Sequence, residues 1–253
     1  MRDKSMIVIG ADPGANKSTV FDGKEIMPYK VGELKIYLDG LKKEKESVLV
    51  CWDSPLTGPK NTERVEDGRG EFSQRIIERF FSRGGAGQKP PSGISVVHYS
   101  GCSHWAMTRA ILGLPRCGLW DTKESDLPFR LLTESEFPKK EMQGRFVVEV
   151  HPALAAWFWC EPSPKKPGTW QYKKDDNILQ KMWEIIQEKI PDEAKKTTPK
   201  NDDELDAVVA YSLGVLWTQQ KKKVFLLGDR STGSFLLPIN ADLKTKFDAF
   251  RKN

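Results

Sequence analysis

Residues 6–14 read Met-Ile-Val-Ile-Gly-Ala-Asp-Pro-Gly, an apolar run followed by an aspartate and a turn. The apolar part is too short for a helix and is predicted to be a buried β-strand, which the Pro-Gly pair brings to an end. Residues 17–21 are predicted to return as a second strand, and the Asp-Gly pair at 22–23 predicts a hairpin turn into a third strand at 24–27. The chain therefore begins with a strand and a hairpin, and Asp12 stands at the end of the first strand.

The rest of the chain alternates between helical and strand-like patterns. Leucines at helical spacing predict a helix over 31–43, and the apolar run 47–52 predicts a further buried strand that leads into Asp53. A last long helix is predicted over 199–219. The other predicted elements are helices at 72–82, 104–112, 152–159 and 178–190, a strand at 145–150, and a final hairpin of 224–227 with 235–237. This order predicts one α/β domain over residues 1–253, with a mixed β-sheet flanked by helices.

The composition excludes several classes of protein. The chain has 253 residues, of which 38% are apolar, so it can bury a sizeable core. Lys and Arg number 40 against 35 Asp and Glu, a small excess that allows a polyanionic partner without requiring one. No apolar run reaches the ~20 residues of a membrane-spanning helix, and the charged N-terminus does not resemble a secretion signal. The four cysteines form no C-x-x-C pair, which is typical of a protein of the reducing cytoplasm.

Acidic residues occur at positions where burial makes a charge costly. Asp12 and Asp53 each follow a predicted buried strand, and Glu149 lies inside another. Asp206 lies in a helical segment that is apolar nearly all round, and such a helix is buried. Asp203 precedes Asp206 by three residues and shares its helical face. A buried carboxylate must be paired, protonated or bound to a metal, so each of these acids needs an explanation.

Each acid except one also has a purely structural explanation. Asp12 and Asp53 precede turn residues and can shape those turns. Glu149 can pair with a buried arginine. The acids of 201–204 can cap the last helix and complement its dipole. Asp206 lies past the first turn of that helix, where neither capping nor the dipole accounts for it.

The last helix has a face on which its acids can approach the sheet. Beyond Asp203 and Asp206, that face continues to Ala210 and Gly214, which are small enough to let the helix lie close to a strand. Two carboxylates ~4 Å apart repel by about 4 kcal/mol at an effective dielectric of ~20, so a cluster must take up protons or bind divalent cations. Carboxylate oxygens select Mg²⁺ or Mn²⁺, and two such ions can activate water against a phosphodiester. The acids therefore predict a metal-dependent nuclease.

The motifs around these acids resemble one protein family. The order strand-Asp, hairpin, helix, strand-Asp and late acidic helix resembles that of the ribonuclease H-like fold. Within that fold the chain resembles the domain of unknown function 429 family, whose members are described as predicted nucleases. The stretches that carry the resemblance are 10–14, 52–56, 149–152, 202–211 and 225–238, of which 202–207, Asp-Asp-Glu-Leu-Asp-Ala, is the best match.

The resemblance implies a five-stranded mixed core sheet and a metal site at one end of it. Asp12, Asp203 and Asp206 are implied as ligands, and either Asp53 or Glu149 completes the site, because the family pattern has acids at both positions. The region of about 57–144 has weaker parallels and is interpreted as an insertion. The implied activity is hydrolysis of DNA or RNA with Mg²⁺ or Mn²⁺.

Other functions share some of these features. The phosphate-loop pattern is excluded, because its glycines would fall at Ala11 and Asn16. An ATPase of the actin-like and sugar-kinase group also begins with a strand, an aspartate and a glycine-containing hairpin, although such proteins usually have a second related domain. A catalytically inactive nucleic-acid-binding module on the same scaffold is the other alternative. An ATPase would bind ATP and leave strands intact, whereas an inactive module would bind nucleic acid without metal-dependent cleavage.

Basic and aromatic side chains are candidates for contact with nucleic acid. Aromatic side chains that stack on bases, together with cations that neutralise phosphates, hold single strands in many proteins. The same aromatics can instead pack on the core, and Arg75 can instead form an ion pair with Glu78 three residues later. The candidates are Lys17, Arg75, Trp170, Tyr172, Lys173 and Lys174.

Overall fold

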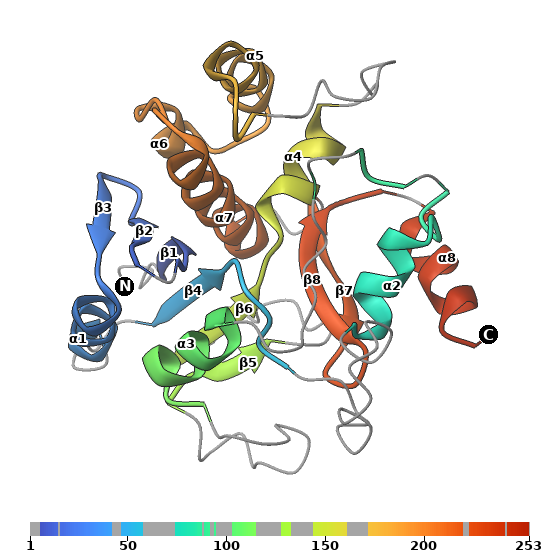
Figure 1. The fold of residues 1–253 in the computed structure, drawn as a ribbon, viewed down its shortest axis with the longest axis horizontal. Coiled ribbons are helices and arrows are strands. Elements are labelled where there is room, and N and C mark those ends of the chain that lie inside the picture. Colours follow the sequence, from blue (N-terminus) through green and yellow to red (C-terminus); the bar gives the residue numbers. More distant parts are fainter. Residues whose placement is uncertain are drawn as a thin grey trace.

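The central element of the computed structural model is a six-stranded β-sheet with the strand order β3-β2-β1-β4-β6-β5 (Figure 1). Strands β1 to β3 form an antiparallel meander, and β4, β6 and β5 run parallel to β1. The strands are β1 (Ile7–Asp12), β2 (Ser18–Phe21), β3 (Ile26–Tyr29), β4 (Val48–Trp52), β5 (Arg130–Leu132) and β6 (Arg145–Glu149). The structure describes residues 6–14, 16–41, 47–57, 74–87, 89–91, 94, 103–114, 128–132, 144–160, 172–219, 223–240 and 242–252. The predicted α/β class is confirmed, and the topology is compatible with a ribonuclease H-like fold.

The sheet has one strand more than the five that the family resemblance implied. The additional strand is β5, which pairs with β6 at the outer edge of the sheet, with Leu131 opposite Val147. It comes from the region of 57–144 that was interpreted as an insertion. Its sequence, Arg-Leu-Leu, is too short to show an alternating pattern, so only its pairing with β6 identifies it as a strand.

Helices cover both faces of the sheet (Figure 1). On one face, α1 (Val31–Leu41) and α3 (Ser103–Leu112) pack side chains such as Leu38 and Ile111 against Val50 and Val147. On the other face lies α7 (Asp202–Gln219), which α4 (Pro152–Trp159) and α6 (Asp192–Lys195) contact in turn. The helix α5 (Asp176–Ile186) packs on α4. The last long helix is therefore enclosed between the sheet and other helices.

Helix α7 is buried from Leu205 to Trp217 and lies unusually close to the sheet. A Cβ atom at Gly10 of β1 would lie 2.1 Å from the carbonyl oxygen of Ala207. A Cβ atom at Gly214 would lie 2.4 Å from the Sγ of Cys51 on β4. The predicted close approach at Gly214 is confirmed. A side chain at Gly10 would collide with the backbone of α7, and one at Gly214 would collide with buried side chains of β1 and β4. Although α7 has an apolar surface, none of the helices described here has the length and hydropathy needed to cross a membrane.

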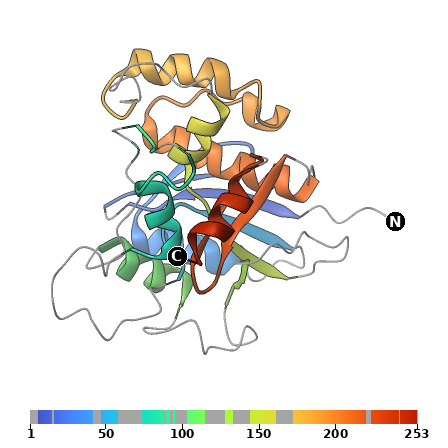
Figure 2. The same cartoon turned by 90° about the vertical axis from the view of Figure 1, so that its right-hand side faces the viewer.

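The C-terminal part of the chain forms a separate two-stranded sheet of β7 (Val224–Asp229) and β8 (Gly233–Pro238), which confirms the predicted final hairpin. Leu236 of β8 pairs with Val150, so the hairpin adjoins β6 just beyond the point where β5 ends. Helices α2 (Ile76–Ser82) and α8 (Leu243–Phe250) pack on the hairpin and on each other (Figure 2). The rings of Phe80 and Phe247, 5.2 Å apart, join these two helices.

Candidate functional site

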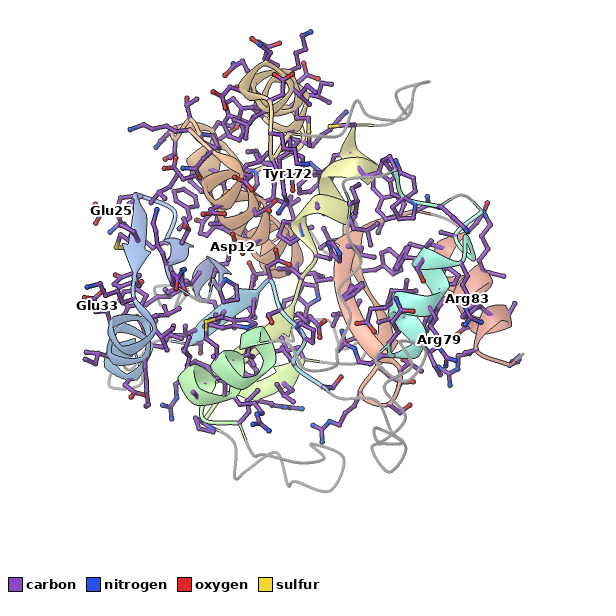
Figure 3. All side chains as sticks on the ribbon, viewed as in Figure 1. Asp12, Glu25, Glu33, Arg79, Arg83 and Tyr172 are labelled. Carbon is purple, nitrogen blue, oxygen red and sulfur yellow. The ribbon has the colours of Figure 1, made fainter. Side chains whose placement is uncertain are left out.

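Asp12 and Asp53 lie side by side at the carboxyl ends of two neighbouring parallel strands. The β1–β4 ladder pairs Ala11 with Trp52, and the backbone N–H of Asp53 donates to the Ala11 carbonyl at 3.0 Å. Because side chains alternate along a strand, Asp12 shares the face of Gly10, which lies directly against α7. Figure 3 shows Asp12 beside this helix. Both aspartates therefore stand at one end of the sheet, next to the first turns of α7.

Helix α7 contributes two further acids to this position. Its start is fixed by Asn201, whose Oδ1 accepts a hydrogen bond from the backbone N–H of Glu204 at 2.9 Å. This confirms the predicted N-cap and accounts for Glu204, which is held at the helix start. Asp203 is half-buried and Asp206, one turn later, is buried. We refer to Asp12, Asp53, Asp203 and Asp206 as the α7-side carboxylates.

The electrostatics show that these acids share one environment. Burial, and then the negative charges of Asp206 and Asp203, raise the pKa of the Asp12 carboxyl to about 8. Burial, and then Asp12 and Asp206, raise the pKa of Asp53 well above its ordinary value. Burial also raises the pKa of Asp206, although Lys173 and Tyr172 act in the opposite direction. Near neutral pH the site is thus a buried concentration of negative charge that disfavours full ionisation.

Two residues that precede α5 bind Asp206 directly. The hydroxyl of Tyr172 donates to Oδ1 of Asp206 at 2.9 Å. The ammonium group of Lys173 lies 3.2 Å from Oδ2 of Asp206 and 3.9 Å from Oδ2 of Asp202. Tyr172 is buried, so it packs in the core as the alternative interpretation allowed and cannot stack on a nucleic-acid base. Lys173, predicted only as a weak nucleic-acid contact, is instead an internal counter-ion of the site.

Thr19 lies next to Asp12, and its side-chain hydroxyl has no hydrogen-bond partner among the residues that the structure describes. It is the register partner of Asp12 on β2, so both side chains point to the face that α7 covers. Thr19 is only 2% exposed, and its Oγ1 has no partner among the described residues. An unpaired buried hydroxyl costs about 1–3 kcal/mol, which a bound ligand or water would relieve. The hydroxyl of Thr19, which can both donate and accept, is therefore not used by the other described side chains of the site.

Glu149 lies on the opposite face of the sheet. The β4–β6 ladder pairs it with Trp52, whose side chain packs with α1 and α3, whereas Asp53 is one residue farther along. Its carboxylate is bound by the guanidinium of Arg75, with Nη1 donating to Oε2 at 2.8 Å. The Nε of Arg75 also donates to Glu78 at 2.8 Å, so the ion pair between these two residues is present as the alternative interpretation allowed. We refer to Arg75, Glu78 and Glu149 as the arginine cluster.

The arginine cluster is fully paired and also holds the chain that follows Asp53. Oε2 of Glu149 accepts the backbone N–H of Leu56 at 3.0 Å, and Nη1 of Arg75 donates to the carbonyl of Thr57 at 3.2 Å. Although burial lowers the pKa of Arg75, the charges of Glu149 and Glu78 raise it well beyond its ordinary value. The cluster thus fixes the segment after β4.

The remaining nucleic-acid candidates have different placements. Arg75 is only 2% exposed, so its guanidinium cannot meet a phosphate at the surface, and its predicted role as such a contact is corrected to that of a buried ion-pair residue. Lys17 and Lys174 are exposed and free to contact a polyanion. Trp170 lies outside the described residues.

The donor set suits a hard divalent cation, although its present arrangement does not enclose one. The α7-side carboxylates offer only carboxylate oxygens, which are the ligands that Mg²⁺ and Mn²⁺ prefer. As the side chains of the described residues stand, no three Asp, Glu, His or Cys groups gather closely enough to hold an ion. Lys173 lies against Asp206 at this position, so binding a cation there requires its ammonium group to move.

The fold and the site define an α/β protein with a carboxylate cluster where two parallel strands meet the last helix. Residues 129–229 match the model of the family described as "Protein of unknown function (DUF429)", which confirms the family that the motifs indicated over this part of the chain. The matched part contains Glu149, Lys173 and the site residues Asp203 and Asp206, whereas Asp12 and Asp53 lie before it. No curated protein and no solved structure matches the chain.

Sequence reasoning missed Thr19 and the internal role of Lys173. Nothing in the local sequence marks Thr19, because a threonine in a strand is ordinary. For Lys173 the signal was its place in a run of aromatic and basic residues, which is equally typical of a surface that binds phosphates. The distinction depends on contacts over 33 residues of sequence, from Lys173 to Asp206.

Proposed function

We propose that this protein is a nuclease that hydrolyses phosphodiester bonds of DNA or RNA with the help of Mg²⁺ or Mn²⁺. The observation that carries this proposal is the meeting of Asp12 and Asp53, at the ends of paired parallel strands, with the start of α7, where Gly10 lies against Ala207 next to Asp206. In a purely structural cluster each carboxylate would be paired within the protein, as the two glutamates of the arginine cluster are. Four carboxylates beside one lysine, as counted over the described residues, instead favour a site that binds cations.

The α7-side carboxylates divide naturally into ligands for two ions. In this proposal Asp12 would contribute to holding both ions, Asp203 and Asp206 would help to hold one, and Asp53 the other. Glu149 is assigned no ligand role, because it lies on the other face of the sheet and is bound by Arg75. Bound Mg²⁺ or Mn²⁺ would supply a water of lowered pKa and stabilise the leaving oxygen of the phosphodiester.

The surroundings of the site assign supporting roles to other residues. Exposed Lys17 follows the turn after β1 and exposed Lys174 adjoins Lys173, so both can neutralise phosphates of a nucleic-acid backbone. A cytoplasmic location belongs to the same proposal, and the free, buried thiols of Cys51 and Cys160 support it.

The test is a cleavage assay on labelled single- and double-stranded DNA and RNA in Mg²⁺, Mn²⁺ or EDTA. We expect cleavage that EDTA abolishes and that Asp12→Asn and Asp206→Asn each reduce by at least ~100-fold, because even the residues that support metal ligands contribute 10- to 100-fold. Asp192→Asn is the matched control, since this aspartate has a side chain that is 91% exposed. Circular dichroism verifies that each variant is folded.

The same protein preparations separate the alternatives. An ATPase would bind ATP in a nucleotide-shift experiment and leave every strand uncut. An inactive module would retard DNA or RNA in a gel without metal-dependent cleavage. Equal cleavage by wild type and both aspartate variants would identify a contaminating nuclease and remove the proposal.

A further inference from the structure

Lys173 binds the carboxylate oxygen that a metal ion would need. Its Nζ lies 3.2 Å from Oδ2 of Asp206, and the hydroxyl of Tyr172 occupies the other oxygen of the same carboxylate. A divalent cation binds carboxylate oxygen at about 2.1 Å, which would bring it to the same side of Asp206 as the ammonium group. Because both groups are cations, they cannot share this position without strong repulsion.

The geometry also allows Lys173 to leave. Its side chain is 47% exposed, whereas that of Asp206 is 3% exposed, so the lysine reaches in from the surface to a fixed, buried acid. It stands in a turn directly before α5, and the N-cap of that helix is Asp175 rather than Lys173. Rotation of the lysine side chain into solvent therefore breaks no backbone contact.

A second observation indicates that the site is built for more than the lysine. The Oγ1 of Thr19, which is 2% exposed and lies beside Asp12, has no hydrogen-bond partner among the described residues. The ammonium group contacts Asp206 and Asp202 on α7 and does not pair with this hydroxyl on β2. Polar groups at the strand side of the site thus remain available to a ligand while Lys173 is in place.

We propose that Lys173 is the residue that sets the metal affinity of the site, because its ammonium group is a competitor that a divalent cation must displace from Asp206. This inference rests on the proposed function. The lysine matches part of the buried negative charge while metal is absent, and it weakens metal binding by the same contact. Removal of its charge therefore strengthens metal binding.

The test is a titration of the purified, metal-free chain with Mn²⁺. Binding is measured by isothermal titration calorimetry and by the loss of the electron paramagnetic resonance signal of free Mn²⁺. We expect Lys173→Gln to bind Mn²⁺ about 10-fold more tightly than wild type. Lys173→Arg, which keeps the charge, should bind no more tightly than wild type. Lys181→Gln is the matched control, because this lysine of α5 is exposed, and its affinity for Mn²⁺ should stay within twofold of wild type.

The outcomes separate this inference from the proposed function. If wild type and Lys173→Gln bind Mn²⁺ equally well, or the variant binds more weakly, the competition is refuted while the metal site stands. If neither protein binds Mn²⁺, both the metal site and the competition are refuted. A Lys173→Gln chain that folds only when Mn²⁺ is added would support the competition, since the metal would then replace the missing charge. Circular dichroism with and without Mn²⁺ detects that case.

Discussion

The α7-side carboxylates and the arginine cluster both lie at the carboxyl end of the sheet, but their buried charges are compensated differently. In the arginine cluster, one guanidinium bonds to both Glu78 and Glu149 and also to Thr57. In the part of the chain that the structure describes, the four α7-side carboxylates are contacted by one half-exposed lysine, Lys173, and the pKa of Asp12 rises to about 8. Each glutamate of the arginine cluster is thus bonded to a buried cation, whereas most of the α7-side carboxylates are not, and the proposed cation binding rests on this difference.

The comparison teaches that a buried acid indicates function only when its partners are known. Glu149 and Asp206 both lie in apolar surroundings, and from sequence both are candidates for a metal site. Glu149 has an arginine and a backbone N–H, so its charge is used to hold the chain after Asp53. Asp206 has a tyrosine and a lysine that reaches in from the surface. The arginine cluster thus holds the backbone of Leu56 and Thr57 and thereby positions the segment that follows Asp53.

The largest expected effect comes from removing the cation of the arginine cluster. Arg75→Met leaves two buried carboxylates without a partner, and we expect it to lower the free energy of unfolding by about 3–5 kcal/mol. Urea denaturation followed by circular dichroism measures the change. The control is Arg251→Met, which breaks a partly exposed ion pair with Asp229 and should cost less than ~1 kcal/mol. Similar losses in the two variants would show that the cluster is no different from a surface pair.

Neutralising one acid from each group should change stability in opposite directions. Glu149→Gln weakens the bonds to Arg75 and should lower the free energy of unfolding by about 2–3 kcal/mol. Asp53→Asn removes a charge from among like charges and should raise it by about 1–2 kcal/mol in EDTA, as happens where active sites trade stability for function. Thermal melts in EDTA check both signs. If Asp53→Asn instead lowers the free energy of unfolding, the charge of Asp53 stabilises the fold as that of Glu149 does, and the contrast between the two groups is wrong.

The stability of the metal-free protein should fall as the pH rises. The Asp12 carboxyl has an ordinary pKa of 3.8 when unfolded and about 8 when folded, so between these values the folded state binds more protons. The free energy of unfolding then decreases with pH over this window, by up to ~1.4 kcal/mol per unit for one group. Denaturation in EDTA from pH 5 to pH 8 measures the slope. Asp12→Asn should flatten it, and an unchanged slope in that variant would assign the titration to other groups.

The smallest expected effect distinguishes two adjacent hydroxyls on β2. Both Ser18 and Thr19 are buried, and their hydroxyl oxygens have no partner within the described part of the chain, but only Thr19 shares the face of Asp12. Thr19→Val should leave stability within ~1 kcal/mol of wild type or slightly above, since it removes an unsatisfied group, and should weaken Mn²⁺ binding about threefold. Ser18→Ala should leave Mn²⁺ binding unchanged. Equal effects of the two variants on Mn²⁺ affinity would exclude a role for the Thr19 hydroxyl at the site.

The main elements and part of the candidate site were predictable from sequence because they depend on local pattern. The apolar run at 6–9, the hairpin after it and the all-round apolar character of α7 each predict their own structure. Asp206 was identifiable because it lies in a buried helix beyond the reach of capping. The short edge strand β5 was not, since three residues contain no pattern.

The choice between Asp53 and Glu149 could not be made from sequence. Each strand has a period of two, but the register between β4 and β6 decides which acid shares a face with Asp12, and register depends on the pairing of segments almost a hundred residues apart. The ion pair between Arg75 and Glu149 was equally unpredictable, because it joins residues 74 positions apart. What remained hidden was therefore which distant residues meet, and this decides the role of each acid.

Gly10, the glycine of β1 that lies under α7, has a consequence for the kind of ion that suits the site. At Gly10 the strand touches the main chain of the helix at Ala207, next to Asp206 and two residues from Asp12 along the strand. The distance between the backbones that carry these two acids is therefore set by direct contact between strand and helix. Cations of different radius should then be discriminated by main-chain spacing, and Gly10→Ala, by widening that spacing, should shift preference toward the larger ion.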